Sequence, residues 1–378
     1  MRELLAIAWG ELGRIFRLRP VFSVLVLAPL IYAAFYPQPY LNEALRDVPL
    51  AVVDQDGTVA SREFVRRVDA SSDVAVAAVL PDLAAAEREV LARQLDGVLL
   101  IPRNFERDLL HGRAAPVALY ADASYLLLYQ RLAGGVTGVA RAFGAEVEAG
   151  RLVATGVDPG VAAAATDPLP LTAVALFNPQ GGYATYLLPA AFVLILQQIL
   201  LIGTGLLCTL PRGQDAVAVG PAALVLGRLL AVLPLQCLAL CFYLVAMPWF
   251  LGIPRLGPVW LILFTALPFV LAVAGLGQVI AALFRKPLTV QLVMAAMGLP
   301  FFFMAGFAWP PEAIPEFVRL PGHLLPSSTA IEALVAVAQM GASPADIGRH
   351  VALLWGLALG YGLLAMLLTA WRGTKHQR

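Results

Sequence analysis

Charged side chains are scarce in this 378-residue chain, making up 13% of it, while hydrophobic residues make up 60%. The mean hydropathy is +0.79, and several apolar segments approach or exceed the roughly 20 residues that a helix needs to cross a bilayer. A soluble globule is excluded by this composition, and no basic patch is concentrated on one folded unit, so a nucleic-acid partner is unsupported. The composition predicts an integral membrane protein.

Cysteine and histidine are also few. The three cysteines lie in or beside apolar segments and indicate no disulfide framework. The four histidines are scattered without the spacing of metal ligands. We therefore expect no metal site and no cofactor bound by this chain.

Nucleotide-binding motifs are missing as well. The nearest approach to a phosphate-binding loop, Gly220 to Gly227-Arg228, has the wrong spacing, Arg in place of Lys, and Leu in place of Ser or Thr. We expect no enzymatic chemistry, and the energy for any active transport must come from a partner or an ion gradient. The apolar spans contain no carboxylate, which weakens the hypothesis of a gradient-driven carrier because a proton relay is hard to build without one.

A water-soluble insert, residues 38–177, interrupts the apolar chain. It contains 18 of the 25 acidic and 12 of the 26 basic residues, so its net charge is −6 while the remainder carries +7. Short Val- and Leu-rich runs predict strands at Val48 to Val53, Val74 to Val79, Gly97 to Ile101 and Val117 to Tyr120. Helical patterns lie near Thr58 to Val68, Asp82 to Arg93, Asn104 to Leu110 and Ser124 to Ala149, and a linker follows to Pro170. This alternation predicts an α/β domain with a mixed or mainly parallel sheet.

The turn Asp54-Gln55-Asp56-Gly57 has two interpretations. A calcium loop would need glycine at its sixth position and a carboxylate at its twelfth, but here glycine is fourth and Val65 is twelfth. The spacing favours a strand-to-helix turn in which the Asp side chains cap the next helix.

Outside the insert we predict an interfacial amphipathic helix followed by six spans. The helix lies within residues 1–19, with Leu5, Ala8, Leu12 and Ile15 on one face. The first span lies within residues 20–37 and is read as an uncleaved span rather than a signal peptide. The other five, within residues 178–378, are Tyr183 to Leu207, Ala223 to Met247, Pro258 to Phe284, Leu288 to Ala308 and Val351 to Trp371. Pro29, Pro189, Pro234, Pro268 and Pro300 predict kinks in the first five spans.

Charge in the loops predicts the orientation. Eleven basic residues lie at the side that holds both termini, and three lie in the short loops of the other side. Positive charge is retained in the cytoplasm, so both termini are expected there and the insert outside. Residues 309–349, between the last two spans, should form an outer cap with a short amphipathic helix on the membrane surface; Trp309, Pro326, Ser327 and Glu332 are its marker residues.

Polar residues inside the spans have two interpretations. Gln197, Gln198 and Gln291 either line a substrate path or form hydrogen bonds between helices. Arg228, near the start of the third span, can extend its side chain to the membrane interface.

The order of short motifs along nearly the whole chain resembles the permease subunit of type-2 ABC exporters, in the bacterial inner-membrane, drug-efflux-like branch with a large periplasmic domain. In the insert the motifs are Val52-Val53-Asp54-Gln55-Asp56, Ser61-Arg62, Asp69-Ala70, Ile101-Pro102 with Phe105, and Asp122 with Tyr125. In the membrane half they are Phe177-Asn178-Pro179, Tyr183, Tyr186, Leu194 to Gln198, Gly227-Arg228, Gly306 with Trp309-Pro310, Pro326-Ser327, Thr329 to Glu332, and Gln339 to Ala342.

The resemblance implies a dimer of permeases, each docked on a cytoplasmic ATPase that binds ATP and magnesium, with a periplasmic adaptor as a further partner. It implies export of an amphipathic or hydrophobic substrate from a bacterial inner membrane or cytoplasm. The positions that it assigns to ATPase coupling are Arg14, Arg17, Arg212, Gln214, Asp215 and Arg228. The loop from Pro211 to Asp215 departs from the longer, glutamate-rich loop of many family members. The alternative hypothesis is a membrane scaffold or mechanotransmission protein whose outer domain binds a partner without transport.

Overall fold

The computed structural model describes residues 2–41, 45–212, 219–307, 309 and 311–375. They form two compact units, one of Met1–Glu43 with Ala175–Arg378 and the other of Ala44–Val174. The charged insert thus has a core of its own, separate from that of the apolar segments.

Six helical segments of the described chain are long and apolar enough to cross a membrane, as predicted. They are Arg19–Tyr40, Tyr183–Thr209 (α9), Pro221–Phe250, Val259–Phe284 (α12), Pro287–Met304 (α13) and Gly348–Arg372. The third comprises α10 (Pro221–Cys241), η3 (Phe242–Ala246) and α11 (Met247–Phe250), and the sixth lies in α16 (Gly348–Lys375). The helix that precedes them is α1 (Arg2–Arg17).

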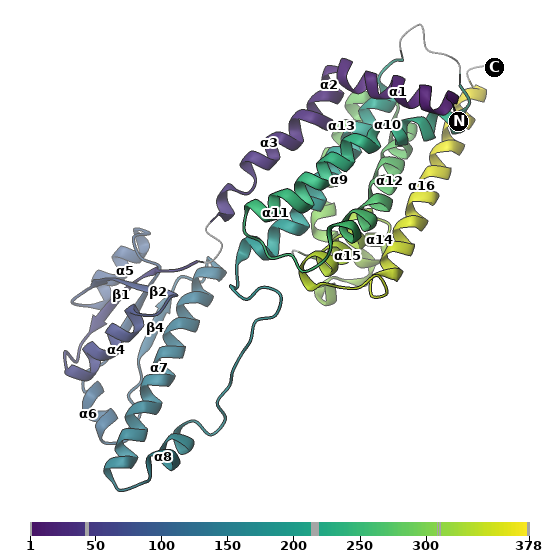
Figure 1. Ribbon diagram of the computed structural model, residues 1–378. Helices are drawn as coiled ribbons and strands as arrows, with labels where there is room; N and C mark the ends of the chain where they lie inside the picture. Colours follow the sequence, from purple (N-terminus) through teal and green to yellow (C-terminus); the bar gives the residue numbers. More distant parts are fainter. Residues whose placement is uncertain (1, 42–44, 213–218, 308, 310, 376–378) are drawn as a thin grey trace. The chain divides into compact units, whose positions relative to one another are not determined.

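The centre of this bundle is formed by α9 and α12, whose most apolar windows are 72% and 61% buried. Figure 1 shows both helices among the others, and α12 packs against both α9 and α16. In contrast, the corresponding window of α13 is only 17% buried. The apolar outer surface of α13 therefore requires lipid or another chain to cover it.

The first span is irregular. It consists of α2 (Arg19–Phe22), a π-helical turn η1 (Ser23–Leu27), α3 (Ala28–Phe35) and a short 3-10 turn at Gln38–Tyr40. Pro29 has no amide hydrogen to donate to the preceding turn, and that turn widens so that the Ala28 N–H bonds to the Ser23 carbonyl. A second π-turn, η3, precedes Pro248 in the third span in the same way.

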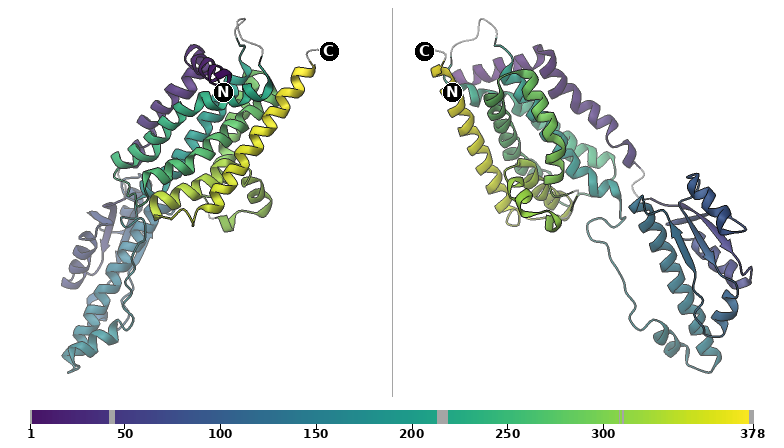
Figure 2. Two further views of the ribbon diagram at one scale, coloured as in Figure 1. Left: turned by 45° about the vertical axis from the view of Figure 1, so that its right-hand side comes forward. Right: turned by 180° about the vertical axis from the view of Figure 1, so that it is seen from behind.

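The segment between the last two spans contains short helices, one of which packs closely on the bundle. Its main helix, α15 (Pro326–Met340), follows η4 (Pro311–Ala313) and α14 (Glu316–Gly322), and it packs against α9, α12 and α16. The Ser327 N–H donates to Gln197 Oε1 in the middle of α9 at 2.9 Å, and Gln339 Nε2 donates to the Thr185 carbonyl near its start at 2.5 Å. The helix therefore runs alongside half of α9, at the end of the bundle opposite α1 (Figure 2), and most of its residues are buried. That this segment caps the outer surface stays a prediction.

The second unit contains a four-stranded sheet in the order β2-β1-β3-β4. Its strands are β1 (Val48–Asp54), β2 (Val74–Val79), β3 (Gly97–Ile101) and β4 (Ala118–Ala121), each within one residue of the prediction. Pairing is parallel except between β3 and β4, which confirms the predicted mixed sheet.

Five helices accompany the sheet: α4 (Val59–Asp69), α5 (Leu83–Leu91), α6 (Phe105–Leu110), α7 (Leu126–Ala154) and α8 (Pro159–Thr166). The main core lies where α4, α6 and α7 cover one face of the sheet, with Phe64, Phe105 and Phe143 in contact. A smaller core lies under α5 on the other face. Helix α8 falls in the predicted linker and was not expected; Asp158 caps it by accepting bonds from two backbone amides.

The acidic turn after β1 is a strand-to-helix turn, as predicted. Asp54 Oδ1 accepts bonds from the N–H groups of Asp56 and Gly57, both at 3.0 Å. Asp56, however, caps α6 rather than the next helix: its Oδ2 accepts a bond from the Glu106 N–H at 3.0 Å, while Thr58 caps α4. The two aspartates thus hold a corner of the α/β unit together.

Candidate functional site

A buried carboxylate lies at the point where α1 meets the bundle. Helix α1 packs against α10 with the line Ala8, Glu11 and Ile15, while Leu5, Trp9 and Phe16 are exposed. Glu11 is only 1% exposed, although charged residues of an amphipathic helix are expected on its polar face. A buried carboxylate requires charged or hydrogen-bonding partners, and the partners here are arginines.

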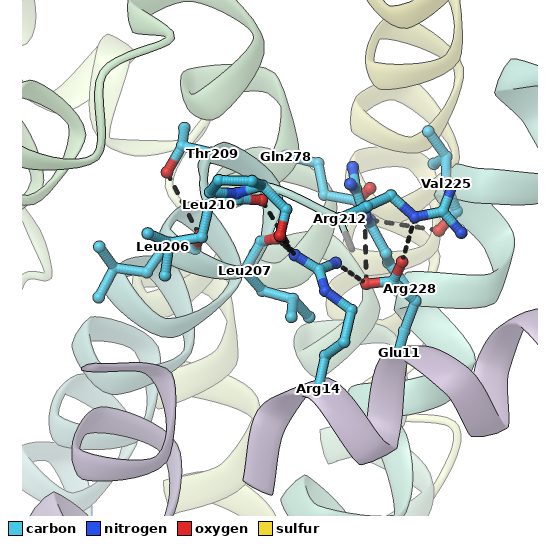
Figure 3. A network of polar contacts seen from close by, with 11 residues as sticks. Glu11, Arg14, Leu206, Leu207, Thr209, Leu210, Arg212, Val225, Arg228 and Gln278 are labelled. Atoms are coloured by element: carbon cyan, nitrogen blue, oxygen red, sulfur yellow. Dashed lines mark hydrogen bonds and ion pairs between the residues drawn. The ribbon is translucent and has the colours of Figure 1, made fainter. Parts of the chain in front are cut away.

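Three arginines from separate segments surround Glu11 (Figure 3). Arg14 Nη1, one turn further along α1, lies 2.5 Å from Glu11 Oε2. Arg212 Nε, beyond the end of α9, lies 3.0 Å from Oε1, and Arg228 Nε of α10 lies 3.8 Å from Oε2. We call these four residues the arginine cluster. It joins α1, the chain after α9, and α10 through one carboxylate.

Arg14 also caps α9. Its Nη2 donates to the carbonyls of Leu207, Leu210 and Pro211 at 3.3, 3.0 and 3.3 Å. The last carbonyls of a helix have no partner within it and carry partial negative charge, so a guanidinium stabilises them. One side chain of α1 therefore fixes both the Glu11 carboxylate and the end of a central helix.

The close approach of α1 to α10 depends on a small residue. A Cβ atom added at Gly227 would lie 2.4 Å from Ile7 Cγ2, closer than side chains pack. The neighbouring Arg228 is buried, and its Nε lies 3.8 Å from Glu11 Oε2 of α1.

The remaining coupling candidates are less constrained. Arg17, at the end of α1, is exposed. Gln214 and Asp215 lie outside the described residues. Among the predicted coupling residues, the structure thus brings Arg14, Arg212 and Arg228 together and adds Glu11. The signal that could have revealed Glu11 is its position one turn before Arg14, combined with an arginine inside a span that needs a counter-charge.

A second feature is a groove of about 400 Å³ between the first span, α9 and α13. We call it the lateral groove. Its walls are apolar except for two phenols and two amides, which belong to Tyr32, Tyr36, Gln197 and Gln198. Gln198 Nε2 donates to the Met294 carbonyl of α13 at 2.6 Å, and Gln197 accepts the bond from Ser327. The paired amides therefore join helices and also line the groove.

The other predicted residues lie away from this groove. Gln291 is exposed on α13, apart from the groove lining. In the predicted cap, Trp309 is exposed, and Pro326 and Ser327 are buried at the start of α15. Glu332 Oε2 lies 3.3 Å from His350 Nε2. In the described part of the chain, no three His, Cys, Asp or Glu side chains gather in a group that could hold a metal ion.

The chain is similar to known membrane transporters along most of its length. A family model described as "ABC-2 family transporter protein" matches residues 20–367. The linearmycin resistance permease protein LnrN of Bacillus subtilis is 24% identical over 371 residues, which cover 92% of this chain and 94% of that protein. The probable multidrug ABC transporter permease YbhS of Escherichia coli K12 is 24% identical over 200 residues, covering 51% of this chain and 53% of its own length.

Proposed function

The chain belongs to the ABC-2 family of transporter proteins, and on this premise we propose that it is the permease subunit of an ATP-driven exporter. ATP and magnesium bind to a separate cytoplasmic ATPase, and this chain binds no cofactor. Two permeases pair, and an amphipathic or hydrophobic substrate leaves the bacterial inner membrane or cytoplasm between them.

The lateral groove is the observation that carries this proposal. A site for an amphipathic molecule is expected to be mostly apolar with a few fixed polar groups, and the groove has that composition. Its volume of about 400 Å³ lies within the range of small-molecule sites. The relative LnrN is named for resistance to linearmycin, and we extend to this chain only the general class of substrate.

The arginine cluster supports a role in coupling. A docked ATPase that pushes on α1 moves Glu11 and Arg14, and through them the end of α9 and the start of α10. Since α9 also forms a wall of the lateral groove, motion of α1 reaches the proposed substrate path through one helix. Arg17, Gln214 and Asp215 remain the other residues proposed to take part in ATPase coupling.

The loop charges support the proposed orientation. Both termini face the cytoplasm, where basic residues are retained, and the α/β unit lies in the periplasm. There the α/β unit takes part in docking a periplasmic adaptor or in gating. Lipid covers the exposed apolar faces of α13 and of the first span that the second permease leaves free.

The test is to purify the chain with the ATPase encoded beside it and to measure ATP hydrolysis in nanodiscs. We expect a stable complex whose hydrolysis is stimulated by amphipathic compounds, and a Gln198→Leu variant that forms the same complex with less stimulation. Failure of any ATPase to co-purify would overturn the proposal. A complex in which the lateral groove stays closed and no compound stimulates hydrolysis would favour the scaffold hypothesis instead.

A further inference from the structure

One hydrogen bond joins the π-turn of the third span to the helical turn that follows the π-turn of the first span. The hydroxyl of Tyr243, within η3 of the third span, donates to the carbonyl of Pro29, directly after η1 of the first span, at 2.5 Å. The two residues are 214 positions apart in the chain. Each π-turn is a point where the regular helix ladder is interrupted, so the bond links the two spans next to these irregular points.

The surroundings of Tyr243 hold its ring firmly. The residue is fully buried, and its ring packs edge-to-face on Phe192 of α9 with centroids 5.2 Å apart. A phenol in an apolar interior has no water to bond with, so its hydroxyl must find a protein acceptor. A helix carbonyl has a second lone pair, and the Pro29 carbonyl can accept this bond while remaining part of its helix.

Pro29 belongs to the segment that forms one wall of the lateral groove. Val24, Ala28, Tyr32 and Tyr36 of this span line the groove, while Tyr243 does not line it. We infer that Tyr243 is a positioning residue of the groove, which acts as a latch on the kinked first span and sets the distance of that wall from α9. This inference rests on the proposed function only for the statement that the groove receives substrate.

The latch has two states. When it is closed, the hydroxyl is satisfied and the wall is held in place. When the first span straightens or swings at η1, the Pro29 carbonyl moves away, the hydroxyl loses its acceptor, and the groove widens. Removing a hydrogen bond whose net contribution is of ordinary size changes the ratio of the closed state to the open state about five-fold.

The test measures the distance between the first and third spans. Spin labels are placed on the exposed native Cys237 and on an Ile31→Cys substitution, in a full-length chain that carries Cys208→Ala and Cys241→Ala, in nanodiscs with its ATPase. We expect Tyr243→Phe, which keeps the ring but removes the hydroxyl, to raise the population of longer distances about five-fold. The matched control is Tyr361→Phe, because Tyr361 donates to the Leu324 carbonyl at 2.6 Å away from the groove; it should leave the distances unchanged.

A second variant tests the mechanism. Pro29→Ala restores the missing amide hydrogen and should straighten the first span, so the distance distribution should shift and a further Tyr243→Phe substitution should add nothing. An unchanged distribution in Tyr243→Phe, or full additivity with Pro29→Ala, would overturn the latch. Because these distances do not depend on export, a chain that transports nothing could still confirm the latch, and a working exporter could still refute it.

Discussion

Glu11 illustrates how one side chain can depend on residues distant in sequence. Its carboxylate forms ion pairs with one arginine of its own helix and with two arginines from segments about two hundred residues later. From the sequence, a glutamate on an amphipathic helix is assigned to the solvent face, because the periodic pattern contains no information about tertiary partners. For the same reason the sequence could not pair Arg228 with Glu11, although the structure places the two side by side.

Neutralising Glu11 should destabilise the bundle strongly. Glu11→Gln leaves three guanidinium groups close together without a counter-charge, and we expect a loss of about 2–4 kcal/mol, less than for a fully buried pair because Arg14 and Arg212 keep partial contact with solvent. Thermal unfolding followed by intrinsic fluorescence should show this as a lower Tm. The control is Glu3→Gln, an exposed position on the same helix, which should leave the Tm unchanged. Equal Tm values for the two variants would contradict the role of Glu11.

The Asp56 side chain gives a pH-dependent prediction for the α/β unit. Burial alone would raise its pKa, but bonds from the Thr58 hydroxyl and from the backbone amides around Glu106 hold the pKa below its ordinary value. A lowered folded-state pKa stabilises the fold above the unfolded-state pKa, near 4, and this contribution is lost as the pH falls through the folded-state value. Asp56→Asn should therefore be less stable than the unmodified protein at pH 7, and the gap in Tm should close toward pH 3.

The control for this experiment is Glu89→Gln, an exposed position on α5. It should show no gap in Tm at either pH. A gap for Asp56→Asn that stays constant across the titration would mean that the carboxylate stabilises the corner by geometry alone.

At the scale of elements, the sequence predicts best where local and tertiary preferences agree. The strands were found within one residue because Val-rich runs end at turn residues and are buried where they lie. The burial of α15 could not be predicted, because the bonds from the Ser327 N–H and the Gln339 amide reach α9, which is more than a hundred residues away in sequence. The π-turn before Pro248 was missed because that proline lies at the end of its span, outside the predicted pattern.

We expect Gln197 to stabilise the fold through its hydrogen bond to α15, whether or not it also contacts substrate. Replacing it by leucine leaves the buried Ser327 N–H without its acceptor, which costs about 1–3 kcal/mol and should lower the Tm. Gln291→Leu, on the exposed face of α13, is the matched control and should have little effect on the Tm. If Gln197→Leu unfolds at the same temperature as the unmodified protein but changes compound-stimulated ATP hydrolysis, the substrate-path interpretation gains and the interhelical one fails.

At the scale of the whole molecule, the two units can be separated by experiment. The proposed ATPase-docking elements, α1 and Arg212, belong to the unit of Met1–Glu43 and Ala175–Arg378. The hydrophobic core of that unit is distinct from the core of the α/β unit. Replacing residues 38–177 by a flexible Gly/Ser linker should leave ATPase binding intact and abolish export. Co-purification and transport into inverted vesicles measure the two properties separately. Export that survives the replacement would show that the α/β unit has no part in docking or gating for transport.

The number of spans and the α/β character of the insert followed from hydropathy and strand–helix alternation, which are properties of single segments. Neither the arginine cluster nor the lateral groove could be predicted as a site, since each is assembled from three or more segments that only folding brings together. The Gln197-Gln198 pair was the partial exception, because amide side chains inside an apolar span can be recognised from the sequence without knowing which way they point.

The cap that Arg14 places on α9 has a consequence for biosynthesis. The bond from Arg14 to the Leu207 carbonyl joins residues 193 positions apart. At about 5–20 residues per second, the ribosome needs roughly 10–40 s to make that stretch. During this interval Glu11 has only Arg14 of the arginine cluster within reach, because Arg212 and Arg228 have not yet been made. The contacts of α1 with α9 and α10 therefore form late, and a nascent chain arrested before Arg228 exposes an incompletely docked α1 to quality-control proteases.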